Sequence, residues 1–129
     1  MQNIGFIGTG LMGFPMAKNI LKAGYKVKAF NRSINKAEPL KDFGAEISNS
    51  IGELVKESHV VITMLTNDDA VNEVIGSDEF LNNLKPNSTV IDMSSIKQTT
   101  AVNHGKNLKS QKINFLDAPV SGGTRNLLF

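Results

Sequence analysis

The sequence contains no cysteine among its 129 residues. This absence excludes disulfide bonds, metal sites built on thiolates and catalysis by a cysteine nucleophile. Long apolar runs are absent too: the opening MQNIGFIGTG has no basic segment, its apolar stretch is broken by glycine, and no later stretch could span a bilayer. We therefore expect a cytoplasmic protein without a signal peptide or a membrane span.

Neither sign of charge is in large excess. Lysine and arginine number 14 against 12 acidic residues, which gives a net charge of +2, and the basic residues are scattered. A scattered positive charge argues against nucleic acid or a membrane surface as a partner. The length fits a single domain over residues 1–129, and the 40% hydrophobic content is ordinary for a soluble globular protein. We expect no metal site.

Short apolar runs alternate with helical patterns along the chain. Several runs are rich in β-branched residues and flanked by polar ones, as strands buried on both faces are. Strand–helix–strand repeats need crossover connections, and therefore a parallel sheet covered on both faces. The predicted fold is α/β, a three-layer Rossmann-type doubly wound parallel sheet that stops after about the sixth strand. The expected strands span residues 3–7, 26–30, 45–47, 60–64, 89–93 and 113–117, and the expected helices span 12–23, 35–43, 51–56, 68–75 and 99–110.

Three glycines with the spacing G-x-G-x-x-G follow the first expected strand and open the first expected helix. In that context the motif is typical of a dinucleotide-binding turn. Gly8 would allow the tight turn, Gly10 the approach of a pyrophosphate, and Gly13 close packing of the helix on the strand. The unpaired amides and the dipole of the first helical turn favour phosphate. We predict that Gly8, Gly10, Leu11, Met12 and Gly13 bind the cofactor.

The end of the second expected strand has no carboxylate. An NAD-specific site usually places an acidic residue there, about twenty residues past the motif, on the ribose 2′-hydroxyl. This chain reads KAFNRSINKA, with Asn31 and Arg32 at that point. A guanidinium suits a 2′-phosphate, and Ser33 and Lys36 are placed to add to the site. We therefore expect Asn31, Arg32 and Ser33 to bind the cofactor, and NADP(H) to be favoured over NAD.

Four segments occur in order along nearly the whole chain: IGFIGTGLMGFPMAKNILKAGYKVKAFNRS, VVITMLTNDDAV, VIDMSSI and FLDAPVSGGT. Together they resemble the β-hydroxyacid dehydrogenase family. Its members include 3-hydroxyisobutyrate dehydrogenase, tartronate semialdehyde reductase, the glyoxylate and succinic semialdehyde reductases and, more distantly, 6-phosphogluconate dehydrogenase. The glycine motif followed by Met12 and PMA is fairly specific to that group, and DAPVSGG is more specific still.

The resemblance implies two further groups of site residues. Leu65 and Thr66 match positions beside the cofactor ribose and nicotinamide, although the family usually has proline where this chain has Thr66. Ser95 matches a hydroxyl residue, usually threonine, that contacts the cofactor. The second group forms the family's substrate turn, here within residues 117–124, where a hydroxyl and backbone amides receive the substrate carboxylate. Its matching residues are Ser121, Gly122 and Gly123.

The resemblance also implies hydride transfer between a nicotinamide and a small 3-hydroxy acid or semialdehyde. In the family, a lysine within a G-x-x-x-K-x-x-N-N helix is the general acid/base. No lysine of this chain stands in that motif, and we assign no catalytic residue. General acid/base catalysis is worth about 10²–10⁴ in rate, so we expect this chain to bind NADP(H) but to catalyse poorly or not at all. Surface that the family's helical second domain covers would favour self-association.

Two other functions stay open at this point. One is a non-catalytic module that binds NADP(H). A reading frame downstream in the DNA that encodes G-x-x-x-K-x-x-N-N would argue against this module and for an interrupted enzyme. The other is the cofactor domain of an imine-type or deazaflavin-linked reductase. The DAPVSGG segment argues against the second, because it suits a substrate that carries a carboxylate.

Overall fold

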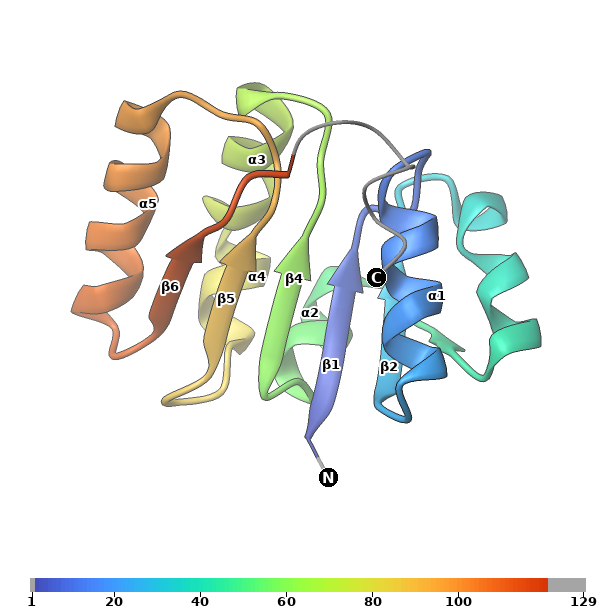
Figure 1. Cartoon of the computed structure of the whole chain (residues 1–129). Coiled ribbons are helices and arrows are strands. Elements are labelled where there is room, and N and C mark those ends of the chain that lie inside the picture. The colour runs from blue at the N-terminus through green and yellow to red at the C-terminus, as the bar shows by residue number, and fades with distance from the viewer. Residues whose placement is uncertain (1, 121–129) are drawn as a thin grey trace.

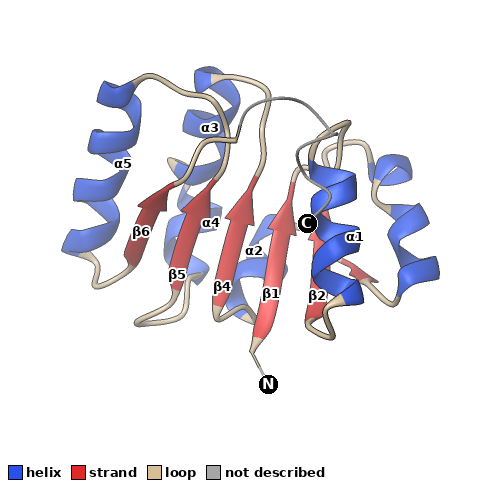
Figure 2. Ribbon diagram, in the orientation of Figure 1, coloured by secondary structure: helices blue, strands red, loops and turns tan. Residues whose placement is uncertain are grey.

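The protein, seen in a computed structural model that describes residues 2–120, is built on one parallel sheet with helices on both faces (Figure 1). The six strands lie in the order β3-β2-β1-β4-β5-β6. Helix α1 crosses one face, and α2 and α4 lie behind the sheet (Figure 2). This confirms the predicted doubly wound α/β fold. The strands are β1 (Asn3–Ile7), β2 (Lys26–Phe30), β3 (Glu46–Ile47), β4 (Val60–Thr63), β5 (Thr89–Asp92) and β6 (Asn114–Asp117).

The connections follow the predicted pattern with two differences. Where one helix was expected over 35–43, the chain forms two 3₁₀ helices, η1 and η2; Pro39 lies in the first turn of η2, and Gly44 ends it with φ of 101°. The second difference is α4, which the sequence prediction missed. Its signal was present, because Ser77 caps the helix by accepting a hydrogen bond from the Phe80 amide at 3.2 Å. The helices are α1 (Gly13–Lys22), η1 (Ile34–Lys36), η2 (Glu38–Phe43), α2 (Ile51–Lys56), α3 (Asp68–Ile75), α4 (Asp78–Asn83) and α5 (Gln98–Ser110).

The central strands are buried on both faces, and their side chains alternate between two apolar cores. In β1, Phe6 belongs to the core that also contains Met16 and Ala17 of α1, whereas Ile7 belongs to the other. Phe6 is fully buried. Burial of such a side chain contributes about 1.5–3 kcal/mol. The described helices include none with the length and apolar character needed to cross a membrane.

The order of the strands reverses at β1. Its last residue, Ile7, pairs with Phe30 of β2 on one side and with Thr63 of β4 on the other. All strands run parallel, so their carboxyl ends meet at one edge of the sheet, the upper edge in Figure 1. We call this the carboxyl edge. Open α/β sheets bind ligands in the crevice where the strand order reverses at that edge.

Candidate functional site

The turn after β1 begins at a glycine that no other residue can replace without strain. Gly8 has φ of +100°, and its amide donates to the Phe30 carbonyl of β2 at 2.9 Å. A Cβ atom at this position would lie 2.1 Å from the Met64 carbonyl oxygen. The turn is therefore in close contact with the end of β2 and with the residue that follows β4.

Gly13 brings the start of α1 into direct contact with the same turn. A Cβ atom on Gly13 would lie 1.8 Å from the Gly8 carbonyl oxygen and 3.2 Å from the Phe6 ring. This is the close packing of helix on strand that the third glycine of the motif was predicted to allow.

Gly10 differs from the other two glycines because its surroundings are open. A Cβ atom there would meet no atom of the described residues within 4 Å, and the next side chain, Leu11, is 83% exposed. No side chain caps α1, and the amides of Leu11, Met12 and Gly13 find no acceptor among residues 2–120. Free amides at a helix N-terminus bind anions. The turn thus has both the room and the donors that a diphosphate needs.

Asn31 holds this turn against the end of β2. Its Oδ1 accepts a hydrogen bond from the Thr9 amide at 2.9 Å, and its Nδ2 donates to the Ser33 carbonyl at 3.0 Å. The side chain of Asn31, predicted to bind a cofactor, therefore has partners within the protein and positions the turn. The hydroxyl of Thr9 is buried and finds no partner within the described part of the chain.

Arg32 lies beside Asn31 at the carboxyl edge and forms an ion pair. Its Nη2 lies 3.0 Å from both carboxylate oxygens of Glu73 in α3. The side chains of Arg32 and Glu73 are 82% and 66% exposed. Ser33 and Lys36, next in the same segment, are also exposed. The side chains of Arg32, Ser33 and Lys36 therefore all reach solvent here, and the guanidinium of Arg32 is paired with a carboxylate.

A buried carboxyl group joins the loops that follow β4 and β5. Asp92 Oδ1 accepts hydrogen bonds from the Thr63 hydroxyl at 2.8 Å, the Ser94 hydroxyl at 2.7 Å and the Ser94 amide at 3.2 Å. The Ser94 hydroxyl in turn accepts from the Leu65 amide at 2.8 Å. All three side chains are fully buried, and Asp92 Oδ2 has no partner among the described residues. Burial raises the pKa of Asp92 above its usual range, although these hydrogen bonds oppose that rise.

Comparison with known proteins identifies the family of this chain. A family model described as the NAD binding domain of 6-phosphogluconate dehydrogenase matches residues 3–128. The chain belongs to this family. The predicted resemblance to the β-hydroxyacid dehydrogenases is confirmed, and the carboxyl edge described above is that of an NAD(P)-binding Rossmann domain of dehydrogenases.

Individual relatives of this NAD(P)-binding domain agree with the family. An uncharacterized oxidoreductase of Bacillus subtilis is 39% identical over 123 residues, which are 95% of this chain and 43% of that protein. The 3-hydroxyisobutyrate dehydrogenase of Mycobacterium tuberculosis, solved with L-serine, is 35% identical with a TM-score of 0.91, over 97% of this chain and 42% of that one. Psf3, solved with NADP⁺ and 2-OPP, is 29% identical with a TM-score of 0.90, over 95% of this chain and 44% of its own. This chain therefore spans about two-fifths of the length of these relatives.

The remaining predicted site residues of the NAD(P)-binding domain lie at the same edge or outside the described residues. Leu65 is half-buried and Thr66 exposed in the loop after β4, and Ser95 is exposed after β5. Beside Ser95, the buried Ser94 makes the contacts that hold the two loops together. The predicted substrate-turn residues Ser121, Gly122 and Gly123 lie outside the described residues.

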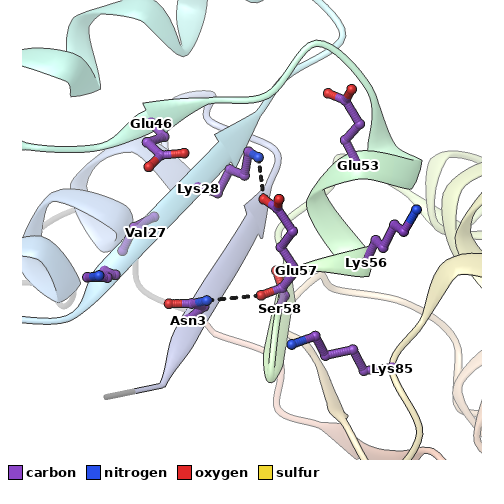
Figure 3. Close-up of a pocket in the computed structure, with 10 residues that line it drawn as sticks. Asn3, Val27, Lys28, Glu46, Glu53, Lys56, Glu57, Ser58 and Lys85 are labelled. Carbon is purple, nitrogen blue, oxygen red and sulfur yellow. Dashed lines mark hydrogen bonds and ion pairs between the residues drawn. The ribbon is translucent and has the colours of Figure 1, made fainter.

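A hollow lies at the edge of the NAD(P)-binding domain opposite the carboxyl edge, where the strands begin (Figure 3). Asn3 and Lys26, the first residues of β1 and β2, line it, together with an ion pair between Lys28 and Glu57. The hydrogen bond between these two side chains raises the pKa of Lys28 and lowers that of Glu57. Because the glycine turn lies at the other end of β1, this hollow is separate from the predicted coenzyme site.

Proposed function

We propose that this chain is the NADP(H)-binding domain of an oxidoreductase that transfers hydride between a nicotinamide and a small 3-hydroxy acid or semialdehyde. The observation that carries the proposal is the open turn at Gly10, where the amides of residues 11–13 have no acceptor within residues 2–120, together with the arginine that follows β2. The likeness to 3-hydroxyisobutyrate dehydrogenases supports the substrate class.

The chain's own residues would bind and orient the coenzyme. Amides of Leu11, Met12 and Gly13 would donate to the diphosphate, and the helix dipole of α1 would favour its negative charge. Arg32 would receive the 2′-phosphate, because a guanidinium pairs with phosphate through several N–H donors and stays charged. Leu65, on the far side of β1, would lie toward the nicotinamide half. When bound, the coenzyme supplies the hydride.

The substrate part of the proposal rests on the DAPVSGG sequence. Ser121, Gly122 and Gly123 would receive a carboxylate through a hydroxyl and backbone amides. The proton at the substrate oxygen would be handled by the lysine of the family's G-x-x-x-K-x-x-N-N motif, which does not occur in residues 1–129. The chain's proposed share of the reaction is therefore to hold the coenzyme and the carboxylate.

Arg32→Ala tests the proposed coenzyme preference. Wild-type chain titrated calorimetrically should bind NADPH more tightly than NADH. A hydrogen bond to a charged group contributes about 1.5–3 kcal/mol, so Arg32→Ala should weaken NADPH binding by about 10- to 100-fold and leave NADH binding nearly unchanged.

Lys22→Ala is the matched control, because it removes an exposed cation at the opposite end of α1. Its NADPH affinity should equal that of the wild type. Equal wild-type affinities for NADPH and NADH, or an Arg32→Ala variant that keeps the preference, would contradict the proposed specificity.

A further inference from the structure

The ion pair between Arg32 and Glu73 joins two segments at the edge of the sheet where the coenzyme is proposed to bind. Arg32 follows β2 and Glu73 lies in α3, the helix after β4; β2 and β4 flank β1. The contact therefore links the segments that follow the two neighbours of β1, the strand that leads into the glycine turn. The two residues are 41 positions apart in the sequence, so the pairing is a product of the fold.

The contact occupies only part of the guanidinium. Both Glu73 oxygens lie 3.0 Å from the same nitrogen, Nη2. The other guanidinium nitrogens of Arg32 have no partner among residues 2–120. A phosphate that approaches this free side would meet the positive charge of Arg32 and, close behind it, the negative charge of Glu73.

We propose that Glu73 is a specificity-determining residue that competes with an anionic ligand for Arg32. This inference rests on the proposed function, in which Arg32 binds the 2′-phosphate of NADP(H). The carboxylate of Glu73 neutralises part of the arginine's charge and repels a phosphate dianion. Glu73 thereby weakens binding at the arginine and sets how much of its charge is available to the 2′-phosphate.

The expected size of the effect follows from the exposure of the pair. Exposed ion pairs are worth about 0.2–1 kcal/mol, which corresponds to a change in affinity of up to about fivefold. The effect should shrink as salt rises, because the Debye length is only about 8 Å at physiological ionic strength.

The test is calorimetric titration with adenosine 2′,5′-bisphosphate and with ADP, which lacks the 2′-phosphate. Glu73→Gln should bind the bisphosphate about two- to fivefold more tightly than the wild type at low salt, with ADP affinity unchanged. In an Arg32→Ala background, Glu73→Gln should have a smaller effect, because no guanidinium is left for which the carboxylate and the phosphate compete. Asp69→Asn is the matched control, because Asp69 is an exposed carboxylate of the same helix without a contact to Arg32.

Each outcome assigns a failure to one of the two proposals. Suppose that Arg32→Ala weakens binding of the bisphosphate relative to ADP, but Glu73→Gln leaves the affinity for the bisphosphate unchanged or lowers it. The inference about Glu73 is then wrong, and the proposed function stands. If Asp69→Asn tightens binding as much as Glu73→Gln, the effect is one of general charge and the specific role of Glu73 is likewise refuted. If Arg32→Ala has no effect on bisphosphate binding, the proposed role of Arg32 fails, and the inference fails with it.

Discussion

We expect Gly13→Ala to lower the free energy of unfolding by about 3 kcal/mol. The added methyl group would lie 1.8 Å from the Gly8 carbonyl oxygen, which is backbone and belongs to a turn fixed by β2 and β4. Helix α1 would have to move away from the sheet and would lose contacts with Phe6. Urea unfolding followed by circular dichroism measures this loss.

Gly10→Ala is the matched control for that experiment, because the same methyl group is added to the same turn but in open space. Its stability should equal or slightly exceed that of the wild type. Its affinity for NADPH should nevertheless fall, since the methyl group stands where the diphosphate is proposed to approach. A Gly13→Ala variant as stable as the wild type would show that the helix does not pack as described.

The second large effect is expected at Asp92. Asp92→Ala removes the acceptor of three hydrogen bonds and leaves the buried hydroxyls of Thr63 and Ser94 and the Ser94 amide without partners. A buried donor without an acceptor costs about 1–3 kcal/mol, so the variant should lose about 3 kcal/mol of stability or more. The loop after β4 should also loosen, because the Leu65 amide is held through Ser94. Urea unfolding measures the first effect and amide hydrogen exchange at Leu65 the second.

Asp92→Asn separates the hydrogen bonds from the charge, since asparagine keeps Oδ1 as an acceptor. Burial raises the pKa of Asp92 in the folded state, so the protonated form is favoured there. The stability that this proton contributes is present below the unfolded pKa of about 3.8 and is lost as the pH rises through the folded pKa. The variant should therefore gain stability relative to the wild type as the pH rises from 3.8 toward neutrality. A relative loss over that range would mean that the folded pKa is lowered.

Much of the fold was predictable because local patterns and topology agree. β1 and β2 have the predicted bounds, and Gly24, with φ of +97°, follows the end of α1 as expected. The break into η1 and η2 was not predicted, because a helical pattern does not distinguish an α-helix from two short 3₁₀ helices.

The site was predictable in its residue types but less so in its contacts. The glycine spacing located the turn, since the motif encodes the steric need for Gly8 and Gly13 and the open space at Gly10. The pairing of Arg32 with Glu73 and the inward contacts of Asn31 depend on segments far apart in the sequence, and no local pattern carries them. Similarly, adjacent serines at 94 and 95 look alike in sequence, and only the fold shows that Ser94 is the buried one.

The most direct test of the central claim is an NMR titration of the ¹⁵N-labelled chain with NADPH and with NADH. The account predicts that both coenzymes shift the amide signals of residues 10–14 most strongly, and that NADPH alone shifts the side-chain Nε–H signal of Arg32. If the turn amides stay unchanged at saturating NADPH while signals elsewhere move, the diphosphate does not bind at the glycine turn and the proposed function is wrong.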